Sequence, residues 1–249
     1  MSEFTHDGTL FGLLTVIDLL LQNHIHPTHI HSHETTTPDL FRSTRHVKTD
    51  ESRAQLLGER IRSEISENAH DHLVYAFLSE RPESDLALFH YIRMGFERGA
   101  DVDRFRSEPW VYTVHSLSRK MAREVHRMQG FVRFDKLMDG TYYAAMEPDF
   151  FILPLLAPYF CNRLQDQDWV IHDVRRGTAA MYNQTDCIIC DLQVSQPLHL
   201  AKGEDTFRKL WQLYFDSIGI AHRTNSRLQQ QLMPKKYWPH LIEKRPRLH

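Results

Sequence analysis

Apolar residues recur at steps of three and four through most of the first half of the chain, which is the spacing of amphipathic helices. Ahead of them, residues 3–6 are expected to form a short strand that ends in the turn Asp7-Gly8-Thr9, and Thr9 is placed to cap the first helix. The predicted helices cover residues 10–21, 52–69, 71–80 and 84–99, and a fifth ends at Gly130. Residues 23–50 are polar, rich in His and Thr, and without periodicity, so we expect a loop or an insertion there.

Beyond residue 130 the pattern changes to short alternating runs. Asp139-Gly140 is a strong hairpin signal between strands expected at 131–134 and 142–147. A helix is expected at 155–164, three strands at 169–173, 178–182 and 186–194, and a last amphipathic helix at 206–218. The chain is therefore expected to be a single α+β domain over 1–249. It would have a helical N-terminal half, an antiparallel sheet of about five strands, and a C-terminal helix followed by a basic tail from 221.

Composition narrows the class of protein without naming a function. The 249 residues can bury a substantial core, and a formal net charge of -2 means that any basic surface must be local. Three cysteines are too few for a disulfide scaffold, which indicates a reducing cytoplasm. Asp18 interrupts the first apolar run, no basic segment precedes it, and no run approaches the roughly 20 residues of a membrane helix. We therefore expect neither a secretory signal nor a membrane partner.

Two motifs raise the question of a metal. Imidazole is a good ligand for zinc, copper or nickel, and the histidines in question are His24, His26, His29, His31 and His33. The alternative is a solvated segment that binds metal only adventitiously. Cys187 and Cys190 have the spacing of a redox pair or half a zinc site, but in a strand residues three apart point to opposite faces. We expect buried, unreactive cysteines, and no metal site or cofactor in this chain.

The clearest charge pattern lies on the helix that ends at Gly130. Arg119, Arg123 and Arg127 fall four residues apart, which places them on one face. If Gly130 ends the helix in a left-handed conformation and a strand follows, then His126, Arg127 and Arg133 come together. Such a corner suits an anion or a phosphate. The alternative is an ordinary solvated helix face.

The tail offers a second basic surface. Cations interleaved with aromatic rings are typical of nucleic-acid surfaces, and the tail contains Arg223, Arg227, Lys235, Lys236, Tyr237 and Trp238. The alternative is a basic extension with its two aromatic residues docked into the core.

Acid–base chemistry has weaker support. Carboxylates and imidazoles can transfer protons, and the candidates are His126, Glu147, Asp149, His172 and Asp173. They would act on a nucleotide or a DNA lesion if one pocket held them. No triad order, Gly-rich phosphate loop or zinc-hydrolase helix accompanies them, so the sequence favours a protein that is not an enzyme.

Several blocks of sequence together resemble a known family. They are DGTLFGLL at 7–14, YIRMGF at 91–96, REVHRMQGFVRF at 123–134, EPD at 147–149 with LPLLAP at 153–158, and WVIHD at 169–173. The motifs LW at 210–211, YF at 214–215, RTNSRL at 223–228 and MPKKYW at 233–238 complete the match. In their order and spacing they are similar to a bacterial family of uncharacterised DNA-metabolism proteins, the radical-SAM-linked conserved hypothetical proteins.

The resemblance implies a role and a partner. Such proteins resemble a segment fused to uracil-DNA-glycosylase-like domains, or are encoded beside a radical-SAM protein suspected of DNA repair. This implies a DNA-associated accessory whose partner brings an iron–sulfur cluster and S-adenosylmethionine. The chain has no Cys-x3-Cys-x2-Cys motif of its own. The alternatives are an enzyme using the pocket above and a pure protein-interaction module. DNA binding requires Arg127 and Arg133 to share a surface with Arg223 or Arg227.

Overall fold

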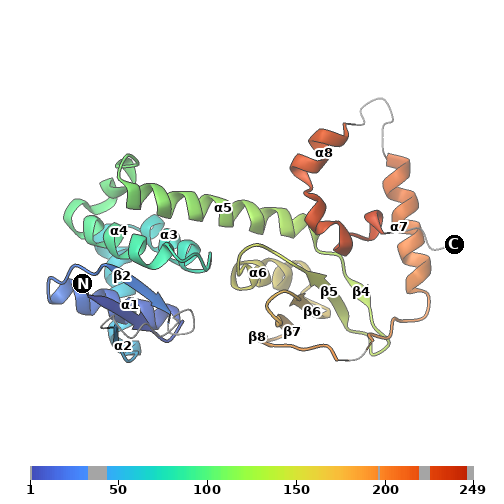
Figure 1. Ribbon diagram of the computed structural model, residues 1–249. Helices are drawn as coiled ribbons and strands as arrows, with labels where there is room; N and C mark the ends of the chain where they lie inside the picture. The colour runs from blue at the N-terminus through green and yellow to red at the C-terminus, as the bar shows by residue number, and fades with distance from the viewer. Residues whose placement is uncertain (1, 33–43, 196, 219–224, 246–249) are drawn as a thin grey trace. The chain divides into compact units, whose positions relative to one another are not determined.

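The computed structural model describes residues 2–32, 44–195, 197–218 and 225–245 (Figure 1). The chain divides into two compact units, Met1–Ala122 and Arg123–His249, and the boundary falls inside the long helix α5 (Pro109–Phe131).

The first unit contains a three-stranded parallel sheet in the order β2-β1-β3. Its strands are β1 (Glu3–His6), β2 (His29–Ser32) and β3 (Thr44–His46). The predicted first strand is confirmed, but the prediction of a loop over 23–50 is wrong for β2 and β3. Ile30 is buried and pairs with Phe4, while His29 is exposed. One apolar residue among histidines is too short an alternation to recognise without its partner strand. His33 lies outside the described residues.

Helices pack against this sheet and against one another. They are α1 (Leu10–Gln22), α2 (Glu51–Arg60), the π-helical turn η2 (Ile61–Ile65), α3 (Glu67–Phe77), α4 (Ser84–Arg98) and the 3-10 helix η3 (Gly99–Arg104). Thr9 caps α1 by accepting a hydrogen bond from the Gly12 amide at 2.9 Å, as predicted. The predicted boundary at residue 70 is wrong, because Ser66 is extended and its hydroxyl caps α3. The core includes Leu13, Ile17, Leu57, Leu88 and Val114.

Helix α5 does not end as the sequence suggested. Gly130 lies within its last turn, and the glycines with positive φ are others. The Val132 amide still donates to the Met128 carbonyl at 3.1 Å. The predicted strand at 131–134 is therefore absent, and Phe134 instead packs edge-on against the ring of Phe160.

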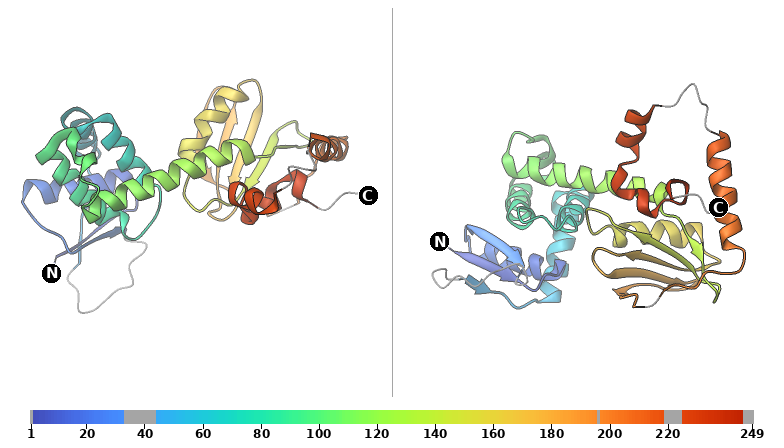
Figure 2. Two further views of the ribbon diagram at one scale, coloured as in Figure 1. Left: turned by 90° about the horizontal axis from the view of Figure 1, so that it is seen from above. Right: turned by 45° about the vertical axis from the view of Figure 1, so that its right-hand side comes forward.

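The second unit is built on a five-stranded sheet in the order β4-β5-β6-β7-β8. Its strands are β4 (Asp135–Lys136), β5 (Tyr142–Met146), β6 (Asp168–Asp173), β7 (Thr178–Asn183) and β8 (Cys187–Asp191). The hairpin at Gly140 is confirmed, with φ of 96°. The sheet is mixed and not purely antiparallel, because β5 and β6 are parallel. Helix α6 (Leu153–Arg163) makes the crossover between them and covers one face of the sheet (Figure 2).

The C-terminal part contains helices beyond the one predicted at 206–218. It consists of α7 (Glu204–Ile218), α8 (Ser226–Leu232) and the 3-10 helices η5 (Lys235–His240) and η6 (Ile242–Lys244). Asn225 caps α8 through a bond from the Leu228 amide at 3.0 Å. The chain is thus an α+β protein, as predicted. Within the described ranges, no helix combines the length and the apolar character needed to span a membrane.

Candidate functional site

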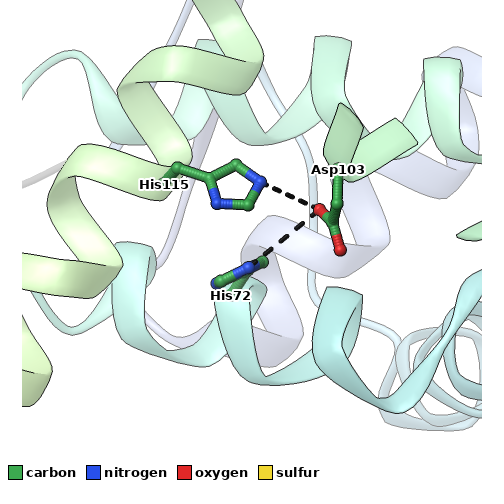
Figure 3. Close-up of side chains that lie close together, drawn as sticks. All are labelled: His72, Asp103 and His115. Atoms are coloured by element: carbon green, nitrogen blue, oxygen red, sulfur yellow. Dashed lines mark hydrogen bonds and ion pairs between the residues drawn. The ribbon is translucent and has the colours of Figure 1, made fainter. Parts of the chain in front are cut away.

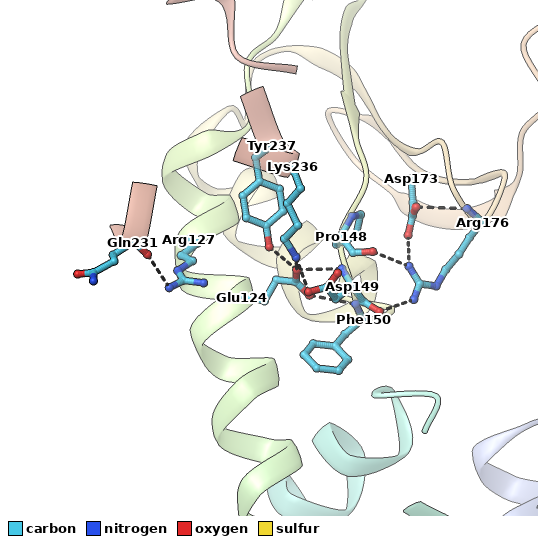
Figure 4. A network of polar contacts seen from close by, with 10 residues as sticks. All are labelled: Glu124, Arg127, Pro148, Asp149, Phe150, Asp173, Arg176, Gln231, Lys236 and Tyr237. Carbon is cyan, nitrogen blue, oxygen red and sulfur yellow. Dashed lines mark hydrogen bonds and ion pairs between the residues drawn. The ribbon is translucent and has the colours of Figure 1, made fainter. Parts of the chain in front are cut away.

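Glu124 is the centre of a polar network in the second unit. Its side chain projects from α5 and is buried, and it accepts hydrogen bonds from the amides of Asp149 at 2.9 Å and Phe150 at 3.0 Å (Figure 4). The Tyr237 hydroxyl also donates to it, and the Lys236 ammonium lies 3.5 Å away. Glu124 therefore holds the chain after β5 and the η5 helix against α5.

Arg176 fastens the same turn from the other side. Its guanidinium donates to the carbonyls of Pro148 at 3.3 Å and Asp149 at 3.2 Å, and to the Asp173 carboxylate at 2.8 Å (Figure 4). Asp173 is completely buried. Burial raises the pKa of Asp173, and the Arg176 contacts oppose that rise. The Asp149 carboxylate pairs with Lys236, so these charges are neutralised within the unit.

The five acid–base candidates do not share one set of partners. Glu147 lies 3.2 Å from His240, and buried His172 lies 2.7 Å from the Tyr143 hydroxyl. Burial lowers the pKa of His172. His126 is exposed on α5. Arg176 connects two of the five, Asp149 and Asp173, by donating to the Asp149 carbonyl and to the Asp173 carboxylate.

The arginines of α5 have different surroundings. Arg119, in the first unit, and Arg123, in the second, are exposed, and helical spacing puts His126 on the same side as Arg123. Arg127 is half-buried, and its guanidinium donates to the Gln231 carbonyl of α8 at 3.3 Å (Figure 4).

Arg133 points elsewhere. It makes a two-pronged ion pair with Glu243 of η6, at 2.8 and 3.2 Å, and lies 5.2 Å from the centre of the Trp211 ring. The Glu243 side chain is fully buried. Although burial opposes it, hydrogen bonds from Arg133 and Trp211 hold the pKa of Glu243 below its ordinary value. The expected corner is therefore divided, because Arg127 binds α8, the helix of Arg227, whereas Arg133 binds η6. The condition stated for DNA binding is met for Arg127 and not for Arg133, so Arg133 is not part of a DNA-binding surface.

The tail is partly docked. Tyr237 is 2% exposed and tilts against Phe131, so its ring is closed to a nucleic-acid base. Burial and Glu124 raise its pKa. Trp238 is half-buried, its indole donates to the Met233 carbonyl at 3.0 Å, and Lys235 lies over its ring. Arg227 is exposed on α8, and Arg223 lies outside the described residues.

The two spaced cysteines are not buried as predicted, because Cys187 is exposed and Cys190 is half-buried. Cys187 and Cys190 both lie on β8. Partial burial and a hydrogen bond with Cys161 raise the pKa of Cys187 to about 12. Cys190 contacts the sulfur of Met181 at 3.5 Å. A thiol with so high a pKa is a poor nucleophile at neutral pH.

Sequence reasoning missed a cluster in the first unit. Asp103 of η3 receives a hydrogen bond from His115 of α5 at 2.9 Å, and His72 of α3 lies 4.0 Å from the same oxygen (Figure 3). Their three ligand atoms lie within 4.8 Å of one another. The residues come from three separate helices and form no motif of fixed spacing. The one available signal is that His115 interrupts the apolar stripe of Val111, Val114 and Leu117.

Comparison with known proteins assigns the chain to a family. The family described as "Domain of unknown function (DUF4130)" matches residues 82–243, from just before α4 to η6. The chain belongs to this DUF4130 family. The match takes in the whole Glu124 network, Asp103 and His115, but not His72. No curated protein and no solved structure matches the chain.

Proposed function

We propose that this DUF4130 protein is an accessory in DNA metabolism that binds the phosphate backbone of DNA through α5 and α8. The observation that carries the proposal is the hydrogen bond from Arg127 to Gln231, which sets α8 beside α5. Arg123 lies one turn before Arg127, and Arg227 one turn before Gln231. Both are exposed, so the contact gathers basic side chains from two helices.

Three other basic residues of the second unit differ from Arg123 and Arg227 because carboxylates already pair with them. Arg133, Lys236 and Arg208 each pair with a carboxylate of the same unit. In the described ranges, neither Arg123 nor Arg227 has such a partner. Because a phosphate competes poorly with a buried carboxylate, we assign Arg123 and Arg227 to DNA. Arg163 and Arg175 are also exposed, but they lie at the end of α6 and between β6 and β7, not on the helices that the Arg127 contact brings together. Lys235 is also exposed at the start of η5, where it lies over the Trp238 ring.

The test is a salt titration of the full-length protein on single- and double-stranded DNA. Each neutralised phosphate should contribute a slope of about -0.9 in log K against log salt on duplex DNA, and about -0.7 on single strands. We expect a steep negative slope between about 50 and 200 mM salt. Affinity that is independent of salt, or absent for both kinds of DNA, would remove the nucleic-acid part of the proposal.

We further propose a protein partner of the radical-SAM or uracil-DNA-glycosylase type, which would bring the iron–sulfur cluster and S-adenosylmethionine. The family resemblance supports it, and so does α7, which exposes a large apolar face. Phe207 is 68% exposed and Tyr214 is 55% exposed. The test is binding of a purified radical-SAM protein from the same genome after nuclease treatment. Binding that Phe207→Asp abolishes supports the partner, whereas equal binding by the variant contradicts α7 as its surface.

The acid–base candidates do not support a second function. Glu147, His172 and Asp173 each contact another side chain of the second unit, and Asp173 also accepts a hydrogen bond from the Arg176 amide. We therefore assign these residues to the stability of that unit.

A further inference from the structure

We propose that His72, Asp103 and His115 bind a divalent transition-metal ion, with Zn²⁺ as the ion to test. Two imidazole nitrogens and one carboxylate oxygen are a ligand set that zinc and other first-row metals accept, with further positions left for water. The site lies wholly within the first unit, whereas the residues assigned to DNA belong to the second.

The distances suit a metal after small side-chain adjustments. Ligand atoms about 2.0–2.1 Å from a tetrahedral zinc lie about 3.3 Å from one another. The Nε2 atom of His115 is 2.9 Å from the Oδ1 atom of Asp103, and that of His72 is 4.0 Å from it. Both rings direct Nε2 toward the same carboxylate oxygen (Figure 3). Rotation about side-chain bonds closes differences of this size.

A buried hydroxyl group orients the Asp103 carboxylate. The hydroxyl of Tyr91, a fully buried residue of α4, donates to the same Asp103 oxygen at 2.7 Å. A hydrogen bond of this kind orients a metal-binding carboxylate. The three ligand side chains are 13% to 23% exposed, so an ion can reach them from solvent.

The arginines near the cluster contact other groups, so the Asp103 carboxylate can bind a metal ion. Arg106 donates to the Asp103 backbone carbonyl and Arg104 pairs with Asp101. Among the described residues, no lysine or arginine side chain pairs with the Asp103 carboxylate.

A second cluster nearby makes a useful contrast. Glu67, His70 and Asp71 of α3 also lie within ligand distance of one another. However, Glu67 and Asp71 are exposed, and Arg62 lies 3.5 Å from Glu67 and 3.4 Å from His70. Arg62 already pairs with Glu67 and contacts His70, so two of the three groups are occupied and His70 serves as the control.

The experiment uses full-length protein stripped of metal by chelation and titrated with Zn²⁺ in competition with a chromogenic chelator. The wild type should bind one equivalent more tightly than any other. His72→Gln, His115→Gln and Asp103→Asn should each weaken that equivalent at least 100-fold, and Tyr91→Phe about 10-fold, as expected for an orienting contact. His70→Gln and His29→Gln should change the zinc affinity by less than about threefold, which is well below the roughly 10-fold loss expected for an orienting residue.

Circular dichroism and thermal unfolding of the metal-free proteins verify that the variants fold. If a histidine variant does not fold, Asp103→Asn decides the question, because its amide oxygen still accepts the Tyr91 bond. The Co²⁺-substituted wild type gives an independent readout, since three N/O ligands produce no thiolate charge-transfer band. The proposal is overturned if no tight equivalent exists, if it survives in the ligand variants, if His29→Gln removes it, or if the thiolate band appears.

Discussion

The Glu124 carboxylate satisfies two backbone amides, a buried hydroxyl and a lysine at once. From the sequence it reads only as a partner for Lys120 four residues before it on the helix. Its actual partners lie 25 to 113 residues away, and a spacing rule within one helix cannot identify them.

Glu124→Gln should destabilise the second unit by about 3 kcal/mol, because the amide carries one acceptor oxygen and leaves a buried N–H without its partner. Urea unfolding followed by tryptophan fluorescence measures the change in the free energy of unfolding. Asp166→Asn is the control, since Asp166 is exposed on the same unit and should stay within about 0.5 kcal/mol. Equal stability of the two variants would show that the network contributes nothing.

Glu243 gives a residue-scale prediction in pH. Because its folded pKa is lowered below 4.5, the ionised carboxylate adds stability above that value, and this stability is lost as pH falls through the folded pKa. Glu243→Gln should therefore lower the free energy of unfolding by about 2 kcal/mol near pH 7, because it leaves the Arg133 guanidinium without a carboxylate partner. The difference from wild type should shrink when unfolding is measured at progressively lower pH below 4.5. A difference that stays constant down to acid pH would contradict the assigned ion pair.

At the scale of elements, the question about α5 is whether Gly130 ends it. In the structure Gly130 is helical and a Cβ there meets nothing within 4 Å. Gly130→Ala should therefore stabilise the protein by about 0.5 kcal/mol, because alanine favours the helix. Gly99, with φ of 59°, is the matched contrast, and Gly99→Ala should cost about 1–3 kcal/mol. Thermal unfolding of both variants measures these changes in stability. A destabilised Gly130→Ala protein would indicate instead that Gly130 is left-handed and ends the helix.

The elements that sequence could predict are those with local signals. The strand 3–6, the Thr9 cap, α4, the Gly140 hairpin and α7 all follow from periodicity, caps and turn residues. Sequence did not predict β2 and β3, whose strand character depends on pairing with β1, or the parallel pairing of β5 with β6. The same limit applies to His72, Asp103 and His115, which only the packing of three helices brings together.

At the scale of the whole molecule, a net charge of -2 gives DNA no general attraction, so binding must come from particular cations. The second unit neutralises most of its buried charges internally, as the pairs of Arg133, Arg176 and Lys236 show. Substitution of the exposed arginines on α5 and α8 is therefore the most direct test of the proposed function. The prediction of a single domain over 1–249 remains a prediction, and the family match at 82–243 extends into both units.

The central claim is that Arg123 and Arg227 contact phosphate. The decisive measurement compares the salt dependence of duplex-DNA binding by Arg123→Gln/Arg227→Gln with that by Arg163→Gln/Arg175→Gln, two exposed arginines of the same unit. Both double variants remove two charges, so a general loss of attraction affects them equally. The account predicts that the first reduces the slope of log K against log salt by about 2 and that the second leaves it unchanged. Equal slopes for the two double variants, or a wild type without measurable binding, would contradict it.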